Sequence, residues 1–247
     1  MSRLLEATYR AEQAHFWFRG LERFSQPLIT EALHGIARPE ILDCGCGTGA
    51  NMKRLSAYGG VTGFDISEAG LRFAHTYNQR RLAQASALAI PFASAAFDFV
   101  TAFDILACLH DHEERQALAE MRRVLRPGAA LLLNTAALPI LRGQHAVFGN
   151  EVRRYTRSRL RASLERAGFT VSRLTYTNFS LLPVIFPIRL SQRLMGLSTP
   201  EETGADITVP PAPINALFSG VVAAEAVALR YVNMPLGSSL LALARKT

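Results

Sequence analysis

The chain contains 247 residues, of which 49% are hydrophobic and 19% are charged. This composition is typical of an ordered globular protein and excludes a long disordered tract, and the length favours one domain with an insertion over two independent domains. The net charge of +7 comes almost wholly from arginine, because Lys53 and Lys246 are the only lysines. No zinc-finger or RNA-binding signature accompanies this charge, so nucleic acid is not the expected partner.

Hydropathy and cysteine usage indicate the compartment. No segment reaches the roughly 18 uninterrupted apolar residues of a transmembrane helix, and the mixed polar N-terminus lacks the apolar core of a signal peptide. The three cysteines are too few for a disulfide framework, and two of them are too close in sequence to pair comfortably. We therefore expect a cytoplasmic protein with reduced thiols and no transmembrane segment.

Short apolar strands alternate with helices over the first half of the chain. A helical pattern covers 4–33, and the breaker Arg126-Pro127-Gly128 ends a later helix. Strands are expected at 41–44, 61–65, 82–87, 97–103 and 129–134, and helices at 51–58, 67–79 (with Ser67 as its N-cap) and 113–125. This order predicts a doubly wound α/β fold with a mostly parallel sheet.

The C-terminal third departs from this alternation. A helix is expected at 156–167 and strands at 169–177 and 238–244, which brings the sheet to seven strands. Between these strands lie an apolar run with prolines that begins at Phe179, a polar linker at 198–213 and an apolar helix at 215–231. So long a gap predicts a functional insertion. We expect one domain with four parts: an N-terminal helical lid (1–36), a core (37–177), a helical cap (178–236) and the final strand (237–247).

The segment ILDCGCGTGAN, residues 41–51, places three glycines after the first predicted strand. In open α/β sheets ligands bind at the carboxyl ends of the strands, and glycine lets the backbone approach a ligand closely. The segment lacks the Gly-Lys-Ser/Thr ending of a P-loop. A metal or redox role for Cys44 and Cys46 is the alternative, but no second cysteine pair completes such a site and Cys108 stands alone.

Two acidic residues indicate the ligand. Asp65 follows the second predicted strand, twenty residues after Gly45, where a carboxylate can accept both ribose hydroxyls of NAD or of an adenosyl cofactor. Asp43, at the end of the first strand, would repel the pyrophosphate of a dinucleotide. It would attract the cationic amino group and sulfonium of S-adenosylmethionine (SAM), so Asp43 favours SAM.

At this point the chain resembles a known family. Residues 41–49 are similar to the first motif of the class I SAM-dependent methyltransferases, of the type 11 group, and GFDIS at 63–67 is similar to the second. ALAIPFASAAFDFVTAFDIL and MRRVLRPGAALL resemble the rest of the core, so the resemblance covers about 40–134. It implies SAM as cofactor, S-adenosylhomocysteine as product, and no metal.

By that resemblance, the backbone around Gly45 and Gly47 holds the methionine part of SAM, and Phe103 lies beside the methyl donor. Together with the arguments above, the expected cofactor-binding residues are Asp43, Gly45, Cys46, Gly47, Asp65 (ribose), Ile66, Ser86 and Ala87 (adenine edge), Phe103, Trp17 and Arg19. Many relatives carry an acid at the position of Ser86 and Glu-His where this chain has Ala107-Cys108. The second departure weakens any catalytic role at that position.

Methyl transfer from a sulfonium depends mainly on alignment, and a general base contributes only when the acceptor must lose a proton. His110 in the loop LHDH and His145 are the candidate bases, with Glu151 a further acceptor-side candidate. Helix capping is the alternative for His110, and a metal site at His110, Asp111 and His112 lacks supporting ligands. Trp17 and Arg19 would fold over the cofactor with His15, although plain core packing is an equal alternative for Trp17.

The predicted cap suggests the acceptor. Its apolar segments indicate a small lipophilic molecule, with oxygen slightly favoured as the acceptor atom; the same segments also fit peripheral membrane contact, a homodimer interface or simple helix packing. The arginine-rich run at 153–161 leaves a protein or RNA methyltransferase as an alternative. A non-catalytic SAM-binding module is a second alternative, and an NAD-dependent oxidoreductase is a distant third.

Overall fold

A seven-stranded sheet organises the protein, of which the computed structural model describes residues 8–143, 146, 150–194 and 209–247. The strand order is β3-β2-β1-β4-β5-β7-β6. All neighbouring strands are parallel except β7, which is antiparallel to β5 and β6. The strands are β1 (Glu40–Cys44), β2 (Gly60–Asp65), β3 (Leu82–Gln84), β4 (Phe97–Phe103), β5 (Leu125–Ala136), β6 (Phe169–Thr177) and β7 (Ser239–Lys246). The predicted doubly wound α/β fold is confirmed.

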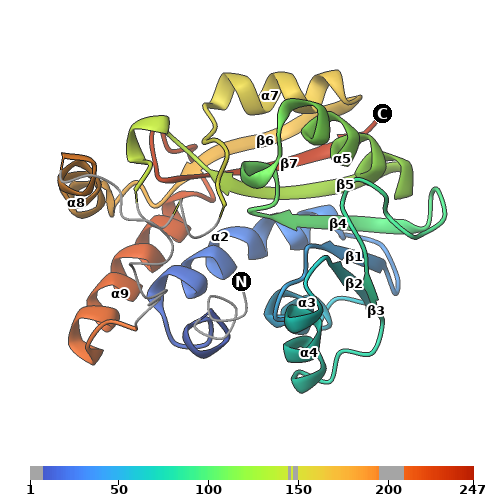
Figure 1. Cartoon of the computed structure of the whole chain (residues 1–247), viewed down its shortest axis with the longest axis horizontal. Coiled ribbons are helices and arrows are strands. Elements are labelled where there is room, and N and C mark those ends of the chain that lie inside the picture. The colour runs from blue at the N-terminus through green and yellow to red at the C-terminus, as the bar shows by residue number, and fades with distance from the viewer. Residues whose placement is uncertain (1–7, 144–145, 147–149, 195–208) are drawn as a thin grey trace.

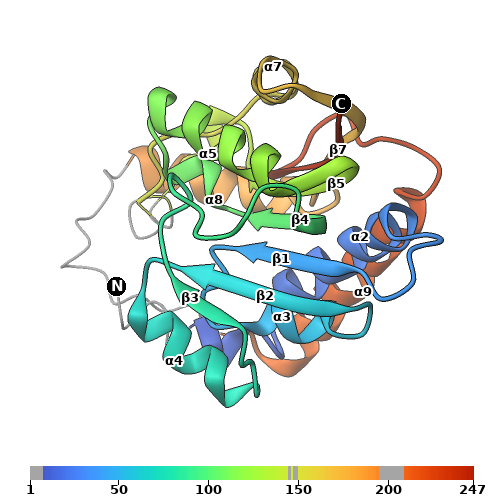
Figure 2. The ribbon, with the colours of Figure 1, turned by 90° about the vertical axis from the view of Figure 1, so that its right-hand side faces the viewer.

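Helices cover both faces of the sheet, as Figures 1 and 2 show. One face carries α5 (Asp111–Val124) and α7 (Arg157–Arg166), and the other carries α2 (Phe16–Ala32), α3 (Ala50–Leu55), α4 (Glu68–Thr76) and α9 (Ala212–Ala228). The remaining helices are α8 (Leu182–Leu194) and two 3-10 turns, η1 (Leu106–Cys108) and η2 (Pro139–Leu141). Both α8 and α9 lie between β6 and β7 in the sequence, where we expected a helical insertion.

The strands are apolar on both sides because each side packs against helices. In β1, Ile41 joins the core beneath α2, α3 and α9, whereas Leu42 and Cys44 join the core beneath α5 and α7. All three side chains are fully buried. This two-sided burial explains why the parallel strands read as continuous apolar runs rather than as alternating ones.

The carboxyl ends of β1, β2 and β4 meet at one edge of the sheet. Cys44, the last residue of β1, pairs in register with Phe64 of β2 and with Ala102 of β4. Asp65, the last residue of β2, and the residues that follow β1 and β4, Gly45 and Asp104, therefore lie at the same edge. This is the edge at which open α/β sheets bind ligands.

One element prediction is wrong, and another is confirmed with a shifted strand. The pattern at 4–33 predicts one helix, but the described part breaks between residues 11 and 16, because the His15 side chain accepts a hydrogen bond from the Trp17 amide and caps α2. The prediction that a helix ends at Arg126-Pro127-Gly128 is confirmed, because α5 ends at Val124 with Leu125 as its C-cap. The strand that follows starts earlier than expected: the tripeptide lies in an irregular part of β5, where the pairing with β4 jumps from Leu125 to Ala130. Proline disfavours helical backbone at the residue before it, so the chain is already extended there.

Most other boundaries shift by a few residues. The strands at 97–103 and 169–177 have the predicted ends, whereas the last helix starts earlier, at Ala212, and so takes the end of the expected linker. The rest of that linker lies largely outside the described residues.

Candidate cofactor and acceptor site

The glycine loop between β1 and α3 is a tight backbone turn. Gly45, Gly47 and Gly49 all have positive φ, a conformation that side chains with a Cβ adopt only with strain. A Cβ on Gly45 would lie 2.8 Å from the Cδ1 atom of Ile105, which comes from the end of β4. The amide of Cys46 donates to the Phe64 carbonyl at 2.9 Å and fixes the loop to β2. The loop therefore offers backbone, rather than side chains, to a ligand.

Asp65 ties two loops together at the end of β2. Its Oδ2 atom accepts a hydrogen bond from the Gly47 amide at 2.8 Å, and its Oδ1 atom accepts one from the Ser67 amide at 2.7 Å. Each carboxylate oxygen has further acceptor capacity, because an ionised carboxylate offers about four lone-pair sites. Asp65 can thus shape the glycine loop and still accept ribose hydroxyls.

Asp43 is a buried carboxylate that lacks one partner. It is 2% exposed, and its Oδ1 atom accepts hydrogen bonds from Thr101 at 2.6 Å and from Asn51 at 2.8 Å. Its Oδ2 atom is buried without any hydrogen bond. Burial raises the pKa of Asp43 to about 6 against the lowering effect of the two hydrogen bonds, and the nearby charge of Asp65 raises it further. A ligand cation would give the Oδ2 atom a partner and would stabilise the buried negative charge of Asp43.

The adenine positions lie around the ends of β2 and β3. Ile66, directly after Asp65, is 66% exposed, an unusual exposure for a large apolar side chain next to a strand end. Ser86 follows β3 with its Oγ atom accepting from the Leu88 amide, and Ala87 beside it is half-buried. Phe103, the last residue of β4, is half-buried against the core beneath α2. The residues present fit a cationic adenosyl cofactor. The assignments of Ile66, Ser86, Ala87 and Phe103 stay predictions.

The N-terminal segment is fastened to the glycine loop by Glu12. This residue is 4% exposed; its carboxylate accepts hydrogen bonds from the hydroxyls of Thr48, at 2.6 Å, and Tyr77, at 3.0 Å. Burial raises its pKa, although both hydrogen bonds act in the opposite direction. Nothing in the local pattern indicated this contact. Trp17 packs against the core beneath α2, and the exposed Arg19 donates to the Gln13 carbonyl, so their cofactor roles stay predictions.

Thr48→Val should loosen this fastening. Valine keeps the shape of threonine but leaves a buried carboxylate oxygen of Glu12 without its partner, so we expect the free energy of unfolding to fall by about 1–3 kcal/mol. Hydrogen exchange should quicken at residues 8–19 more than elsewhere, as mass spectrometry can measure. Thr30→Val on the exposed side of α2 is the matched control and should leave both unchanged. Equal exchange in the two variants would contradict a fastened N-terminal segment.

The thiols do not behave as ligands or nucleophiles. Cys44 and Cys46 are buried, and burial raises the pKa of each far above its usual range. Burial also raises the pKa of Cys108, to about 11. Protonated thiols are poor metal ligands and poor nucleophiles. Within the described residues, no group of three or more His, Cys, Asp or Glu side chains could hold a metal ion.

Of the two predicted bases, only His110 is described. It is exposed and forms the N-cap of α5, where its amide donates to the Glu113 carboxylate at 2.8 Å. His145 lies outside the described residues. Ala107, where relatives carry glutamate, is 1% exposed, and its carbonyl accepts from the amides of Val152 and Arg153. The catalytic role of His110 stays a prediction.

A second polar cluster lies at the same edge and was largely missed. Asp104, directly after β4, contacts Asn134 of β5, whose Nδ2 atom lies 3.0 and 3.1 Å from the two carboxylate oxygens. Glu151 pairs with Arg154 at 3.0 Å, and both affect the pKa of Asp104. Only Glu151 was a candidate from the sequence. The available signal was an acidic residue directly after a buried strand.

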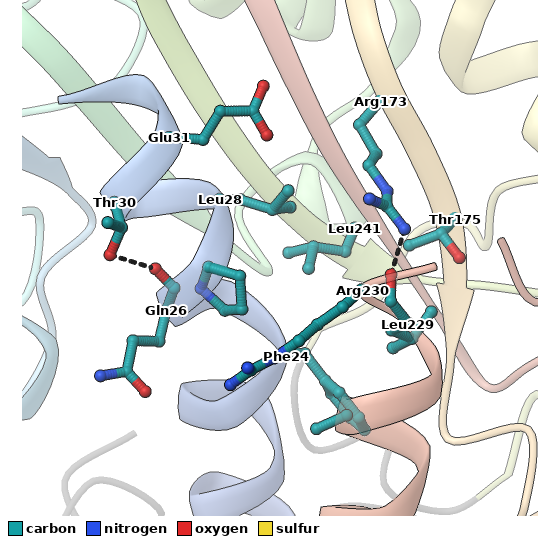
Figure 3. A pocket seen from close by; sticks show the side chains of 12 residues that line it. Phe24, Gln26, Leu28, Thr30, Glu31, Arg173, Thr175, Leu229, Arg230 and Leu241 are labelled. Atoms are coloured by element: carbon teal, nitrogen blue, oxygen red, sulfur yellow. Dashed lines mark hydrogen bonds between the residues drawn. The ribbon is translucent and has the colours of Figure 1, made fainter. Parts of the chain in front are cut away.

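A cavity of about 490 Å³ lies elsewhere, between α2, α9, β6 and β7 (Figure 3). Leu28, Leu241 and Leu229 line it with Phe24, and the Arg173 guanidinium donates to the Leu229 carbonyl at its side. None of the predicted site residues lines this cavity. The glycine loop stays the candidate ligand site.

Residues 42–133 match the family model described as a methyltransferase domain. This match spans β1 to β5 and includes Asp43, the glycine loop and Asp65. This part of the chain is therefore similar to a methyltransferase domain. Similarity to this family implies SAM as the cofactor, and the buried, partnerless oxygen of Asp43 fits its cationic end.

The curated relatives of this chain are named as methyltransferases. The chain is 33% identical over 114 residues to the O-methyltransferase rstn1 of Aspergillus nomiae, covering 42% of this chain and 50% of that protein. It is 36% identical over 131 residues to the demethylmenaquinone methyltransferase of Lactiplantibacillus plantarum, covering 49% and 54%. The chain thus spans about half the length of these curated relatives.

The fold also extends beyond the matched segment. The solved structure of the [4+2]-cyclase SpnF superposes with a TM-score of 0.60 over 93% of this chain and 82% of that one, at 21% identity. At this identity the likeness shows the fold alone. Because SpnF is named a cyclase, the same fold is not restricted to one reaction, and the reaction of this protein has to be argued from its site.

Proposed function

We propose that this protein transfers a methyl group from SAM to the oxygen of a small, apolar acceptor. The observation that carries the proposal is the partnerless Oδ2 atom of buried Asp43 beside the glycine loop, because it calls for a cation at this edge of the sheet. Asp43 would hold the amino group of SAM, Asp65 its ribose, and Ile66 with the loop at Ser86 its adenine. Bound SAM supplies an electrophilic methyl group on a positively charged sulfur.

Three features support an apolar acceptor. Phe103 and Ile105 lie at the end of β4, next to the glycine loop, and present apolar surface there. Helix α8 carries exposed apolar side chains, namely Val184, Phe186, Ile188 and Leu190. The named relatives include several O-methyltransferases and an enzyme that methylates demethylmenaquinone. No described helix has the length and apolarity that a membrane crossing requires.

The arginine-rich run does not favour an RNA or acidic-protein acceptor. Arg153 and Arg159 pair with Asp111 and Glu114 of α5. In the same run, Arg154 pairs with Glu151, Arg157 donates to the Met234 carbonyl at 2.6 Å, and Arg161 pairs with Glu165. These arginines are therefore paired within the protein, and their contacts hold α7 and the segment before it in place.

A methyl-transfer assay tests the proposed function. The purified protein is incubated with SAM labelled in its methyl group and with 2-naphthol, a long-chain ester of 4-hydroxybenzoate or a reduced quinone with a prenyl side chain. We expect label in an ether product with at least one of these hydroxyl compounds and none with transfer RNA or a histone peptide. Label only in RNA or peptide would overturn the assignment, and SAM binding without transfer to any hydroxyl compound would favour a non-catalytic module.

A further inference from the structure

Asp104 occupies the position next to the reacting end of the proposed site. It follows Phe103, and the next residue, Ile105, packs directly against Gly45 of the glycine loop. Its backbone has a φ of +60°, which is unusual for a residue other than glycine and occurs preferentially at functional positions. This conformation is held by the Asp104 amide, which donates to the Asn134 carbonyl at 2.8 Å.

The carboxylate of Asp104 is supported on one side and open on the other. Asn134 is 3% exposed and donates from Nδ2 to both carboxylate oxygens, whereas the Asp104 side chain can be reached by solvent. The Oδ1 atom of Asn134 is buried without a partner. Rotation of the amide by half a turn would let that oxygen accept a proton from Asp104, so Asn134 can serve both protonation states. An arginine in its place would hold Asp104 ionised.

The surroundings of Asp104 bring its pKa close to neutral, where a carboxyl group can both take up and release a proton. Partial loss of solvation raises the pKa of Asp104 to about 7, although its side chain is exposed; the negative charge of Glu151 raises the pKa further, while the Asn134 hydrogen bond and Arg154 lower it. Cys108 is the other titratable neighbour, and its Sγ atom contacts the Asp104 carbonyl. Arg189 of α8 lies near Glu151 and Arg154, and burial lowers its pKa.

We propose that Asp104 is the general base of this methyltransferase, and that its acceptors are therefore neutral hydroxyl compounds, such as phenols or enols, whose proton must leave during transfer. This inference rests on the proposed function. As the acceptor O–H bond breaks, the proton would move to a carboxylate oxygen of Asp104, and the electron pair left on oxygen would form the new bond to the methyl carbon. The bond between that carbon and the sulfur of SAM would break at the same time, and its electron pair would stay on sulfur in the neutral leaving group, S-adenosylhomocysteine. The proton then passes to solvent, to which the Asp104 side chain is open.

Asp104→Asn tests the base with a matched shape, because asparagine also tolerates positive φ. The two probes are 2-naphthol, which is neutral near pH 7 and must lose a proton, and pentafluorophenol, which is already ionised there. Loss of a base should slow transfer to 2-naphthol by about 10²–10⁴-fold and leave transfer to pentafluorophenol nearly unchanged. SAM affinity should change less than about twofold, and Glu165→Gln on α7 is the control for loss of a carboxylate.

Two further readouts do not depend on the rate alone. Carboxyl carbon NMR of the wild type should show an aspartate signal that titrates near neutral pH and is missing in Asp104→Asn. Glu151→Gln should shift that titration, and the acidic limb of the rate profile with 2-naphthol, to lower pH.

The outcomes separate this inference from the proposed function. Equal loss with both phenols, or full activity of Asp104→Asn on 2-naphthol, would overturn the base. The proposal would also be overturned if His110→Ala, rather than Asp104→Asn, slowed transfer to 2-naphthol and left transfer to pentafluorophenol unchanged. If the wild type binds SAM but methylates no hydroxyl compound, the proposed function fails and the base fails with it.

Discussion

Asp65→Ala should weaken the binding of SAM by roughly 10- to 150-fold, or about 1.5–3 kcal/mol, because it removes a charged acceptor for the ribose hydroxyls. The same change removes the hydrogen bonds to the amides of Gly47 and Ser67, so the glycine loop also loses its fixed shape. Isothermal titration calorimetry measures the change.

SAM, S-adenosylhomocysteine and 5′-methylthioadenosine share the same ribose, so loss of a ribose contact should weaken all three. S-adenosylhomocysteine and 5′-methylthioadenosine should lose affinity for Asp65→Ala by a similar factor. Glu68→Ala removes an exposed carboxylate from the first turn of α4 and should leave all three affinities unchanged. Wild-type affinity in Asp65→Ala would show that the ribose is held elsewhere.

Asp43→Asn should weaken SAM and S-adenosylhomocysteine by a similar factor, roughly 10- to 150-fold, yet leave 5′-methylthioadenosine nearly unaffected. The physical reason is that Asp43 would contact the amino group, which methylthioadenosine lacks. Asparagine keeps an oxygen for Thr101 but offers no negative charge to a cation. An equal loss for all three ligands would indicate that Asp43 only supports the loop.

The affinity for SAM should also depend on pH through Asp43. The pKa of this group in the free protein is raised to about 6, and a bound cation stabilises the ionised form. Affinity should therefore rise between about pH 5 and pH 7 and then level off, whereas Asp43→Asn should show no such rise. A rise that persists in the variant would assign the titration to another group.

The effect of Asp104 on stability should depend on pH in the opposite direction to its effect on activity: ionised Asp104 would support transfer at higher pH but destabilise the fold there. Its pKa is raised in the folded protein above its ordinary value, so the folded state binds the proton more tightly than the unfolded state between about pH 4 and pH 7. The contribution of Asp104 to stability is therefore largest at low pH and is lost as pH rises to about 7. Above that pH, Asp104→Asn should melt at a higher temperature than the wild type, and the difference should shrink toward pH 4.

The cofactor side of the site could be predicted because its signals are local. Asp43 and Asp65 lie at the ends of strands, and the glycines follow a strand, whose apolar patterns are plain in the sequence; the fold brings strand ends to one edge whatever the details of packing. The sequence also predicts that Asp43 selects a cation. It did not show the partnerless Oδ2 atom, which depends on the positions of Asn51 and Thr101.

The acceptor side depends on contacts between distant segments. Asp104 and Asn134 come from different strands, and the pair of Glu151 and Arg154 comes from the segment before α7. Their proximity follows from the order of β4 and β5 in the sheet and from the path of that segment, which no local pattern encodes. For the same reason the contact between Glu12 and Thr48 could not be predicted.

Calorimetric titration of the wild-type protein with SAM, S-adenosylhomocysteine and NAD tests the central claim most directly. The two adenosyl ligands each carry a cationic amino group for Asp43, whereas NAD would bring a pyrophosphate to the buried carboxylate. We predict that SAM and S-adenosylhomocysteine bind and that NAD does not. Tight binding of NAD, with no binding of SAM, would contradict the assignment of this site.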